Sequence, residues 1–243
     1  ESVVSWQLLS STVFGGSLRG AGAFAADTLT LEATATELNL ARVAETFKST
    51  SPLTGQLGFH LKGGGPVSDF AHAFKGDLAV YISGGRVPEV PVIIRALTSA
   101  NLVKIEEQLK GERGKGIVVT KGEADAKIEG GVANVTRLVL DSRALRVGYT
   151  GKVSFLDKQL DGVVVLQPLN LADQIINDIP ILGKLLMGDG KTFLPLWFSV
   201  KGPYHDPKVR SMPTKSITTP VKNVLEGILK LPKKAIDTIR GKK

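Results

Sequence analysis

Histidine and carboxylate side chains are the first candidates for chemistry in this sequence, and their spacing argues against it. The three histidines, His60, His72 and His205, stand apart from one another, and the chain has no cysteine, so the ligand spacing of a zinc site is missing. Glu106 and Glu107 are neighbours in a predicted helix, which is typical of a solvated face rather than of an acid–base pair. We therefore expect neither a metal site nor catalytic residues.

Two glycine-containing segments resemble nucleotide-binding motifs without fulfilling them. Residues 190–192, Gly-Lys-Thr, match the end of a phosphate loop, but the glycine that this motif requires at position 185 is Leu185. The segment also follows a predicted helix and precedes an apolar strand, the reverse of the motif's order. Residues 15–20 are rich in glycine, yet no helical pattern follows, so a hairpin turn explains them better than a dinucleotide site. The sequence thus predicts a protein that is not an enzyme and has no cofactor.

Alternation of apolar and polar residues is the dominant pattern along the chain, and it is typical of β-strands. It occurs in residues 28–36, 56–62, 77–82, 132–141, 145–149, 153–155, 160–166 and 194–200. Turn-forming residues separate these runs at 63–66, 84–85, 130–131, 141–142 and 157–158. Strands that recur at about 10–12 residues favour antiparallel pairing. We predict a mainly β (α+β) fold, a long curled antiparallel sheet that forms a groove or an open half-barrel.

Helical spacing is confined to a few short segments. The pattern predicts helices over 39–47, over 67–74 with Ser68 as a cap, and over 91–109 with a break near 99–101. The pattern also predicts a helix over 171–187, kinked or broken at Pro180, and two short amphipathic helices over 219–240.

Positive charge is concentrated at the C-terminal end of the chain. Of the net charge of +8, residues 214–243 contribute +6, from eight basic and two acidic side chains, so the remainder carries about +2. We therefore divide the chain into a β-sheet body with inserted helices (1–213) and a basic amphipathic helical tail (214–243). The tail suits an anionic membrane surface, with contacts from Lys222, Lys230, Lys233, Lys234 and Arg240. Packing of its apolar stripe onto the edge or end of the sheet is an equal alternative.

Nucleic acid is not a predicted partner. Aromatic residues make up 6% of the chain and are not interleaved with the basic ones, so no stacking platform for bases is evident.

Several short segments occur in a characteristic order between Pro52 and Val209. They are Pro-Leu-Thr-Gly-Gln-Leu at 52–57, Phe-Lys-Gly-Asp-Leu at 74–78, Gly-Gly at 84–85, Gly-Gly-Val at 130–132, Leu-Asp-Ser at 140–142, Tyr-Thr-Gly-Lys-Val at 149–153, Ile-Pro-Ile-Leu-Gly at 179–183 and Lys-Gly-Pro-Tyr-His-Asp-Pro-Lys-Val at 201–209. Through these segments the chain resembles the AsmA-like C-terminal region of Gram-negative envelope proteins, which are related to bridge-like lipid transfer proteins. The first fifty residues fit that pattern only loosely.

The resemblance implies a periplasmic body that an N-terminal helix tethers to the inner membrane. The chain starts at Glu1 without a methionine or a targeting segment, so we expect a fragment or a processed product. The resemblance further implies a role in outer-membrane biogenesis, in which the protein binds or conducts phospholipid, and possible contacts with envelope proteins. It brings no catalytic residues.

The alternating strands supply the apolar side chains that could line a lipid groove. The predicted groove residues are Leu57, Phe59, Leu61, Leu78, Val80, Ile82, Leu138, Leu140, Val153, Phe155, Val164, Leu166, Leu196 and Phe198. Burying a hydrocarbon chain there would remove about 0.8 kcal/mol of hydration cost per methylene. The alternative is a structural or interaction scaffold of the cell envelope, with the same sheet but a filled core and no groove.

Overall fold

The structure is a computed structural model that describes residues 3–48, 53–88, 90–100, 116–169, 187–188, 192–193 and 195–213. The tail over 214–243 and the predicted helices over 101–109 and 171–186 lie outside these ranges, as do residues 190–191.

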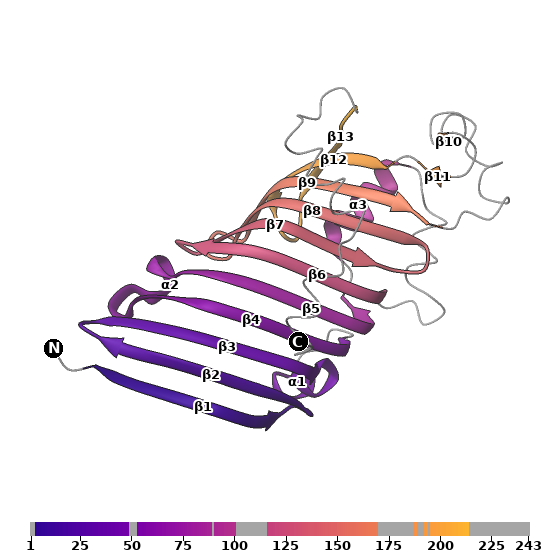
Figure 1. The fold of residues 1–243 in the computed structure, drawn as a ribbon. Coiled ribbons are helices and arrows are strands. Elements are labelled where there is room, and N and C mark those ends of the chain that lie inside the picture. Colours follow the sequence, from indigo (N-terminus) through magenta and orange to yellow (C-terminus); the bar gives the residue numbers. More distant parts are fainter. Residues whose placement is uncertain are drawn as a thin grey trace.

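One antiparallel sheet of 11 strands dominates the described part of the chain (Figure 1). Its strands follow chain order: β1 (Val4–Val13), β2 (Gly16–Ala25), β3 (Thr28–Asn39), β4 (Thr54–Pro66), β5 (Lys75–Val87), β6 (Ile117–Glu129), β7 (Val132–Asp141), β8 (Leu145–Ser154), β9 (Gln159–Pro168), β12 (Leu196–Pro203) and β13 (Lys208–Ser211). A separate two-stranded hairpin joins β10 (Met187–Gly188) to β11 (Thr192–Phe193). In the pairing order, β1 and β13 are the two edges, so the sheet is open. The prediction of a mainly β fold with one antiparallel sheet is confirmed.

The described helices are short and lie between strands. Helix α1 (Leu40–Thr46) begins after Asn39, whose side-chain oxygen accepts the backbone N–H groups of Ala41 and Arg42 at 3.0 and 3.3 Å. A 3₁₀ turn, η1 (Val67–Asp69), runs into α2 (Phe70–Ala73), and α3 (Pro91–Ser99) carries a proline at its first position. The prediction of Ser68 as a helix cap is wrong, because its hydroxyl donates instead to the Asp27 carboxylate at 2.8 Å.

Two predicted turns are also wrong, because residues 63–66 and 84–85 lie inside β4 and β5. Gly63 pairs with Gly76 on the neighbouring strand, and a Cβ atom on either residue would stand within 3 Å of the Phe74 ring. These glycines therefore make room for a packed aromatic side chain and do not reverse the chain. The turn predicted at Gly130–Gly131 is confirmed, and both of its residues have positive φ.

Strand register gives the sheet one face that is almost wholly apolar, called here the apolar face. We call a row of residues paired across successive strands a rung. One rung contains Ala33, Leu61, Leu78, Ala126, Val135, Gly151, Gly162 and Val200. The next contains Ala35, Phe59, Val80, Ala124, Leu138, Tyr149, Val164 and Phe198, and a third contains Leu38, Leu57, Ile82, Gly122, Leu140, Val147, Leu166 and Leu196. Apolar side chains thus continue from strand to strand across the sheet.

The opposite side of the sheet, called here the polar face, carries ion pairs between residues that are paired across adjacent strands. They join Glu32 to Lys62 at 3.2 Å, Lys75 to Glu129 at 2.6 Å, Asp125 to Arg137 at 2.8 Å, Asp141 to Arg146 at 2.5 Å and Asp161 to Lys201 at 3.2 Å. The members of each pair stand directly opposite one another on adjacent strands. A slip of one residue would separate these charges and turn the apolar side chains to the other face.

We predict that Gly63→Ala destabilises the protein by about 1–3 kcal/mol, because the added methyl would lie 2.4 Å from the Lys75 carbonyl oxygen and 2.6 Å from the Phe74 ring. Urea unfolding measures the effect. Lys62→Ala, an exposed change at the adjacent position, is the control and should cost less than about 1 kcal/mol. Equal stabilities of the two variants would contradict the packing role of the glycine.

Candidate functional site

Helix α3 covers the apolar face over the C-terminal strands. Val92, Ile93, Ala96 and Leu97 of α3 belong to the same core cluster as apolar-face residues of β8, β9 and β12. These are Leu145, Val147, Tyr149, Val164, Leu166, Phe198 and Val200. An ion pair between Arg95 and Asp206 ties the helix to the turn between β12 and β13. This part of the face is therefore a packed core.

Thirteen of the fourteen predicted groove residues lie on the apolar face, but their burial differs along the sheet. Val164, Leu166 and Phe198 are at most 1% exposed. Leu138, Leu140, Val153 and Leu196 pack against that core and are partly buried. In β4 and β5 the predicted residues are also half-buried, and of these Ile82 packs against that core; they are Leu57, Phe59, Leu61, Leu78, Val80 and Ile82. Phe155 lies beyond the end of β8 and is 51% exposed.

The half-buried part of the apolar face lies over β3, β4 and β5, and short helices adjoin it. Helices α1 and α2 both contact β4, and they lie at opposite ends of the strands (Figure 1). Near α1, Ala35, Leu38 and Leu40 are buried, and near α2 the Phe74 ring lies over Gly63 and Gly76. Between these ends, Leu61 and Val80 retain exposed apolar surface.

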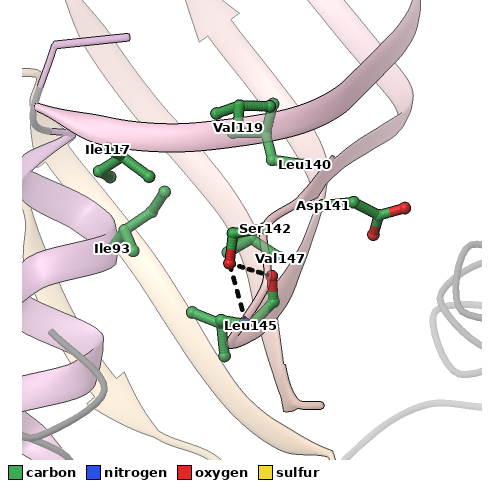
Figure 2. A pocket seen from close by; sticks show the side chains of 8 residues that line it. All are labelled: Ile93, Ile117, Val119, Leu140, Asp141, Ser142, Leu145 and Val147. Atoms are coloured by element: carbon green, nitrogen blue, oxygen red, sulfur yellow. Dashed lines mark hydrogen bonds between the residues drawn. The ribbon is translucent and has the colours of Figure 1, made fainter. Parts of the chain in front are cut away.

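A small pocket opens beside α3, at the border between covered and half-buried strands (Figure 2). Its lining residues are Ile93, Ile117, Val119, Leu140, Asp141, Ser142, Leu145 and Val147. Its empty volume, about 220 Å³ including a part open to solvent, is below that of usual ligand sites, about 300–1,000 Å³. The Ser142 hydroxyl is engaged within its own turn, where it accepts the Leu145 N–H at 2.9 Å and bonds the Leu145 carbonyl oxygen at 2.8 Å. The pocket is therefore an apolar notch without an available nucleophile.

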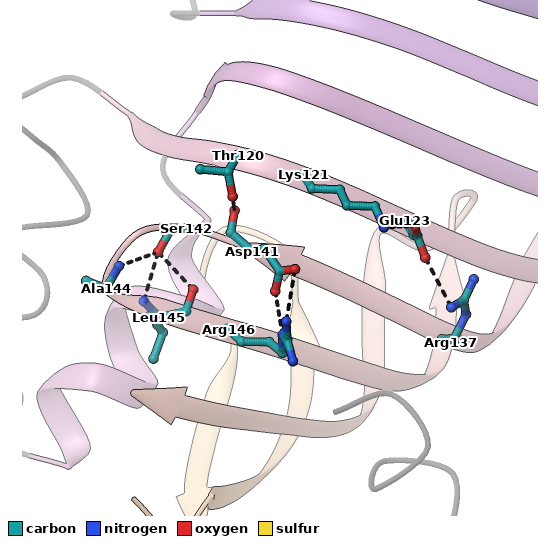
Figure 3. Close-up of polar contacts among 9 residues, drawn as sticks. All are labelled: Thr120, Lys121, Glu123, Arg137, Asp141, Ser142, Ala144, Leu145 and Arg146. Atoms are coloured by element: carbon teal, nitrogen blue, oxygen red, sulfur yellow. Dashed lines mark hydrogen bonds and ion pairs between the residues drawn. The ribbon is translucent and has the colours of Figure 1, made fainter. Parts of the chain in front are cut away.

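A buried carboxylate on the polar face, that of Glu123, forms ion pairs with side chains of the sheet (Figure 3). Glu123 is 6% exposed and pairs with Lys121 of its own strand and with Arg137, whose Nη1 lies 3.1 Å from its Oε2. Arg137 also pairs with Asp125. Both oxygens of Glu123 thus face cations, which offsets the cost of burying the charge.

A second, smaller core on the polar face was missed by sequence reasoning. It consists of Val139, Val165 and Trp197, with Val163 and Met212 packed against them. Val139, Val165 and Trp197 lie on one rung with Gly148 between Val139 and Val165. These three residues are apolar at positions of the polar face, and that departure from alternation was the signal in the sequence.

The histidines have local structural partners where the structure gives any. His60 bonds Thr34 at 2.9 Å on the polar face, and His72 bonds Asp69 at 2.7 Å; His205 is exposed in the turn before β13. Within the described ranges, no group of three or more histidine or carboxylate side chains is arranged to hold a metal ion. Burial raises the pKa of Tyr149, which keeps this phenol neutral as it donates to the Lys152 carbonyl oxygen at 2.9 Å.

Comparisons with known proteins add no relative. No protein-family model, no curated protein and no solved structure matches the chain. None of the described helices is both long and apolar enough to cross a membrane. The predicted surface contacts Lys222, Lys230, Lys233, Lys234 and Arg240 lie outside the described residues.

We predict unequal costs for truncating leucines on the two parts of the apolar core. Leu97→Ala, in the covered part, should cost about 2–5 kcal/mol, because Leu97 is fully buried and its loss leaves a cavity. Leu61→Ala, in the half-buried part, should cost about 1 kcal/mol, because water already reaches that side chain. Urea unfolding of both variants measures the difference, and equal costs would show that both parts are equally packed.

Proposed function

We propose that this protein is a non-enzymatic lipid-binding module, which holds phospholipid acyl chains against the half-buried part of its apolar face. The observation that carries the proposal is the contrast along one continuous face. Val164, Phe198 and Val200 are sealed in the core with α3, whereas Leu61, Leu78 and Val80 on the same two rungs remain partly exposed.

Solvent physics explains why an acyl chain suits this surface. Each methylene taken out of water contributes about 0.8 kcal/mol, and a contact of this kind needs no directional partner. Rungs of alkyl side chains therefore hold a hydrocarbon chain without selecting one position along it. The polar headgroup stays in water beside the strands, where its solvation is retained.

The wider setting of the proposal comes from the resemblance to AsmA-like envelope proteins. On that resemblance we propose a periplasmic module, tethered to the inner membrane, that binds or conducts phospholipid for outer-membrane biogenesis. The basic tail would then meet an anionic leaflet, since each lysine or arginine near such a surface adds about 1 kcal/mol of attraction. Envelope proteins are possible further partners.

A structural scaffold is the second candidate, and the covered strands favour it. There the apolar face is used entirely in sealing a core around α3. If the same held over β3 to β5, the sheet would act as a spacer between envelope components and would bind no lipid.

Photochemical labelling separates the two candidates. The full chain would be incubated with phosphatidylglycerol vesicles that contain a phospholipid with a diazirine in one acyl chain, then irradiated and digested for mass spectrometry. We expect saturable labelling of residues on β4 and β5, such as Leu61 and Val80, and none at Phe198. Absence of saturable labelling anywhere would contradict lipid binding and support the scaffold.

A matched pair of variants tests the face itself. Val80→Lys places a charge on the apolar face, whereas Ala79→Lys places the same charge on the polar face of the same strand. We expect Val80→Lys to lower labelling at least about tenfold, since a charge in contact with hydrocarbon is costly, and Ala79→Lys to leave it unchanged. Circular dichroism would establish that both variants are folded. Equal labelling of the two would contradict binding on the apolar face.

A further inference from the structure

The two edges of the sheet differ in the features that normally keep an edge strand unpaired. Edge strand β13 has four residues, including Lys208 and Arg210, and follows Pro207. Short length, charge and proline are the usual means of preventing a further strand from adding. Edge strand β1 has ten residues and contains no charged residue and no proline. A bulge between Leu8 and Ser11 is its one such feature, and it leaves Val4–Leu8 as the regular stretch of this edge.

Exposed apolar side chains also gather at the β1 edge. Val3, Val4, Trp6 and Phe24 are 63%, 62%, 46% and 42% exposed. Val4 pairs with Phe24, and the Trp6 ring lies over Gly22, where a Cβ atom would come within 2.5 Å of it. Trp6 therefore lies flat on β2 at the edge of the apolar face, with part of its surface in water.

We propose that β1 pairs antiparallel with β1 of a second copy of this chain, so that two sheets join edge to edge. Backbone N–H and C=O groups on the outer side of an edge strand bind a further strand, and the described residues place no strand there. A twofold axis perpendicular to the sheet would keep the apolar faces of both copies on one side.

The composition of β1 favours a second copy as the occupant. Antiparallel self-pairing sets residues near the twofold axis against themselves or close sequence neighbours, where a charge would meet a like charge; β1 has no charged residue. A second copy also matches β1 in length and alternation. The proposed register sets Val4 opposite Leu8: Trp6 then opposes its own copy on the apolar face, and Ser5 opposes Gln7 on the polar face. The pairing would extend the apolar face across both copies, and it does not depend on lipid binding.

Charge introduced on the polar face of β1 tests the pairing. Ser5 and Gln7 are exposed and lie opposite Ala23 and Ala21 on β2, so lysine fits at both positions in a single copy. Sedimentation equilibrium of the full chain without lipid should give twice 25.8 kDa for the wild type. The double variant Ser5→Lys/Gln7→Lys should dissociate at least about tenfold more readily, because like charges then face each other across the joint.

Mixing variants of opposite charge gives the most direct test of the pairing. The double variant Ser5→Glu/Gln7→Glu should also dissociate, and an equimolar mixture of the lysine and glutamate variants should restore the dimer. Ser211→Lys, on the exposed end of β13, should leave the wild-type mass unchanged. A wild-type mass of 25.8 kDa at about 100 µM, a dimer that survives the lysine variant, or a mixture that stays monomeric would each overturn the proposal.

Discussion

Strand register is the constraint on which the rest of this structure depends. Because side chains alternate between the faces of a sheet, one register places Leu61, Leu78 and Val200 on a common rung and directs Lys62, Asp77 and Lys201 to the other side. Ion pairs between direct neighbours hold that register in place from β3 to β12. The apolar face is thus a property of the whole sheet, and no single strand creates it.

Helix α3 decides how much of that face serves as core. It returns over the strands that follow it in the sequence and is tied to the far end of the sheet through Arg95 and Asp206. The folded state gains its stability there by removing Leu97, Leu145 and Phe198 from water. Among the described elements, α1 and α2 contact the ends of β4, and of β5 only Val87 and Ile82 join or pack against the core around α3. A tightly packed part and a partly exposed part of the apolar face thus lie along one sheet.

The sequence allowed the fold class to be predicted, because alternation is a local pattern and most strands obey it. It did not reveal β6, whose alternate residues Gly122 and Ala124 are too small to give a clear apolar signal. It also did not reveal β1 and β2, in which glycine and serine weaken the contrast between faces. The glycines at 63–65 suggested a turn. The structural role of Gly63 is to leave room for the Phe74 ring, and that contact cannot be read from the sequence.

The candidate site was predictable as a face but not as a bounded region. Parity along each strand placed thirteen of the fourteen chosen residues together. The packing of α3 determines which of these residues are buried. Alternation along a strand does not predict where a helix packs in the tertiary structure. Phe155 has the right parity but stands in the turn after β8, so it does not belong to the sheet.

The chain-order topology of the sheet has a consequence for how such a protein can change in length. From β1 to β8, each strand pairs only with the strands directly before and after it in the sequence. Insertion or loss of one hairpin would therefore leave every other pairing intact, and the number of strands could vary without redesign of the remainder. The same nearest-neighbour order lets folding proceed by successive addition of strands, and most of these closures are local; the longest joins β5 to β6 through α3.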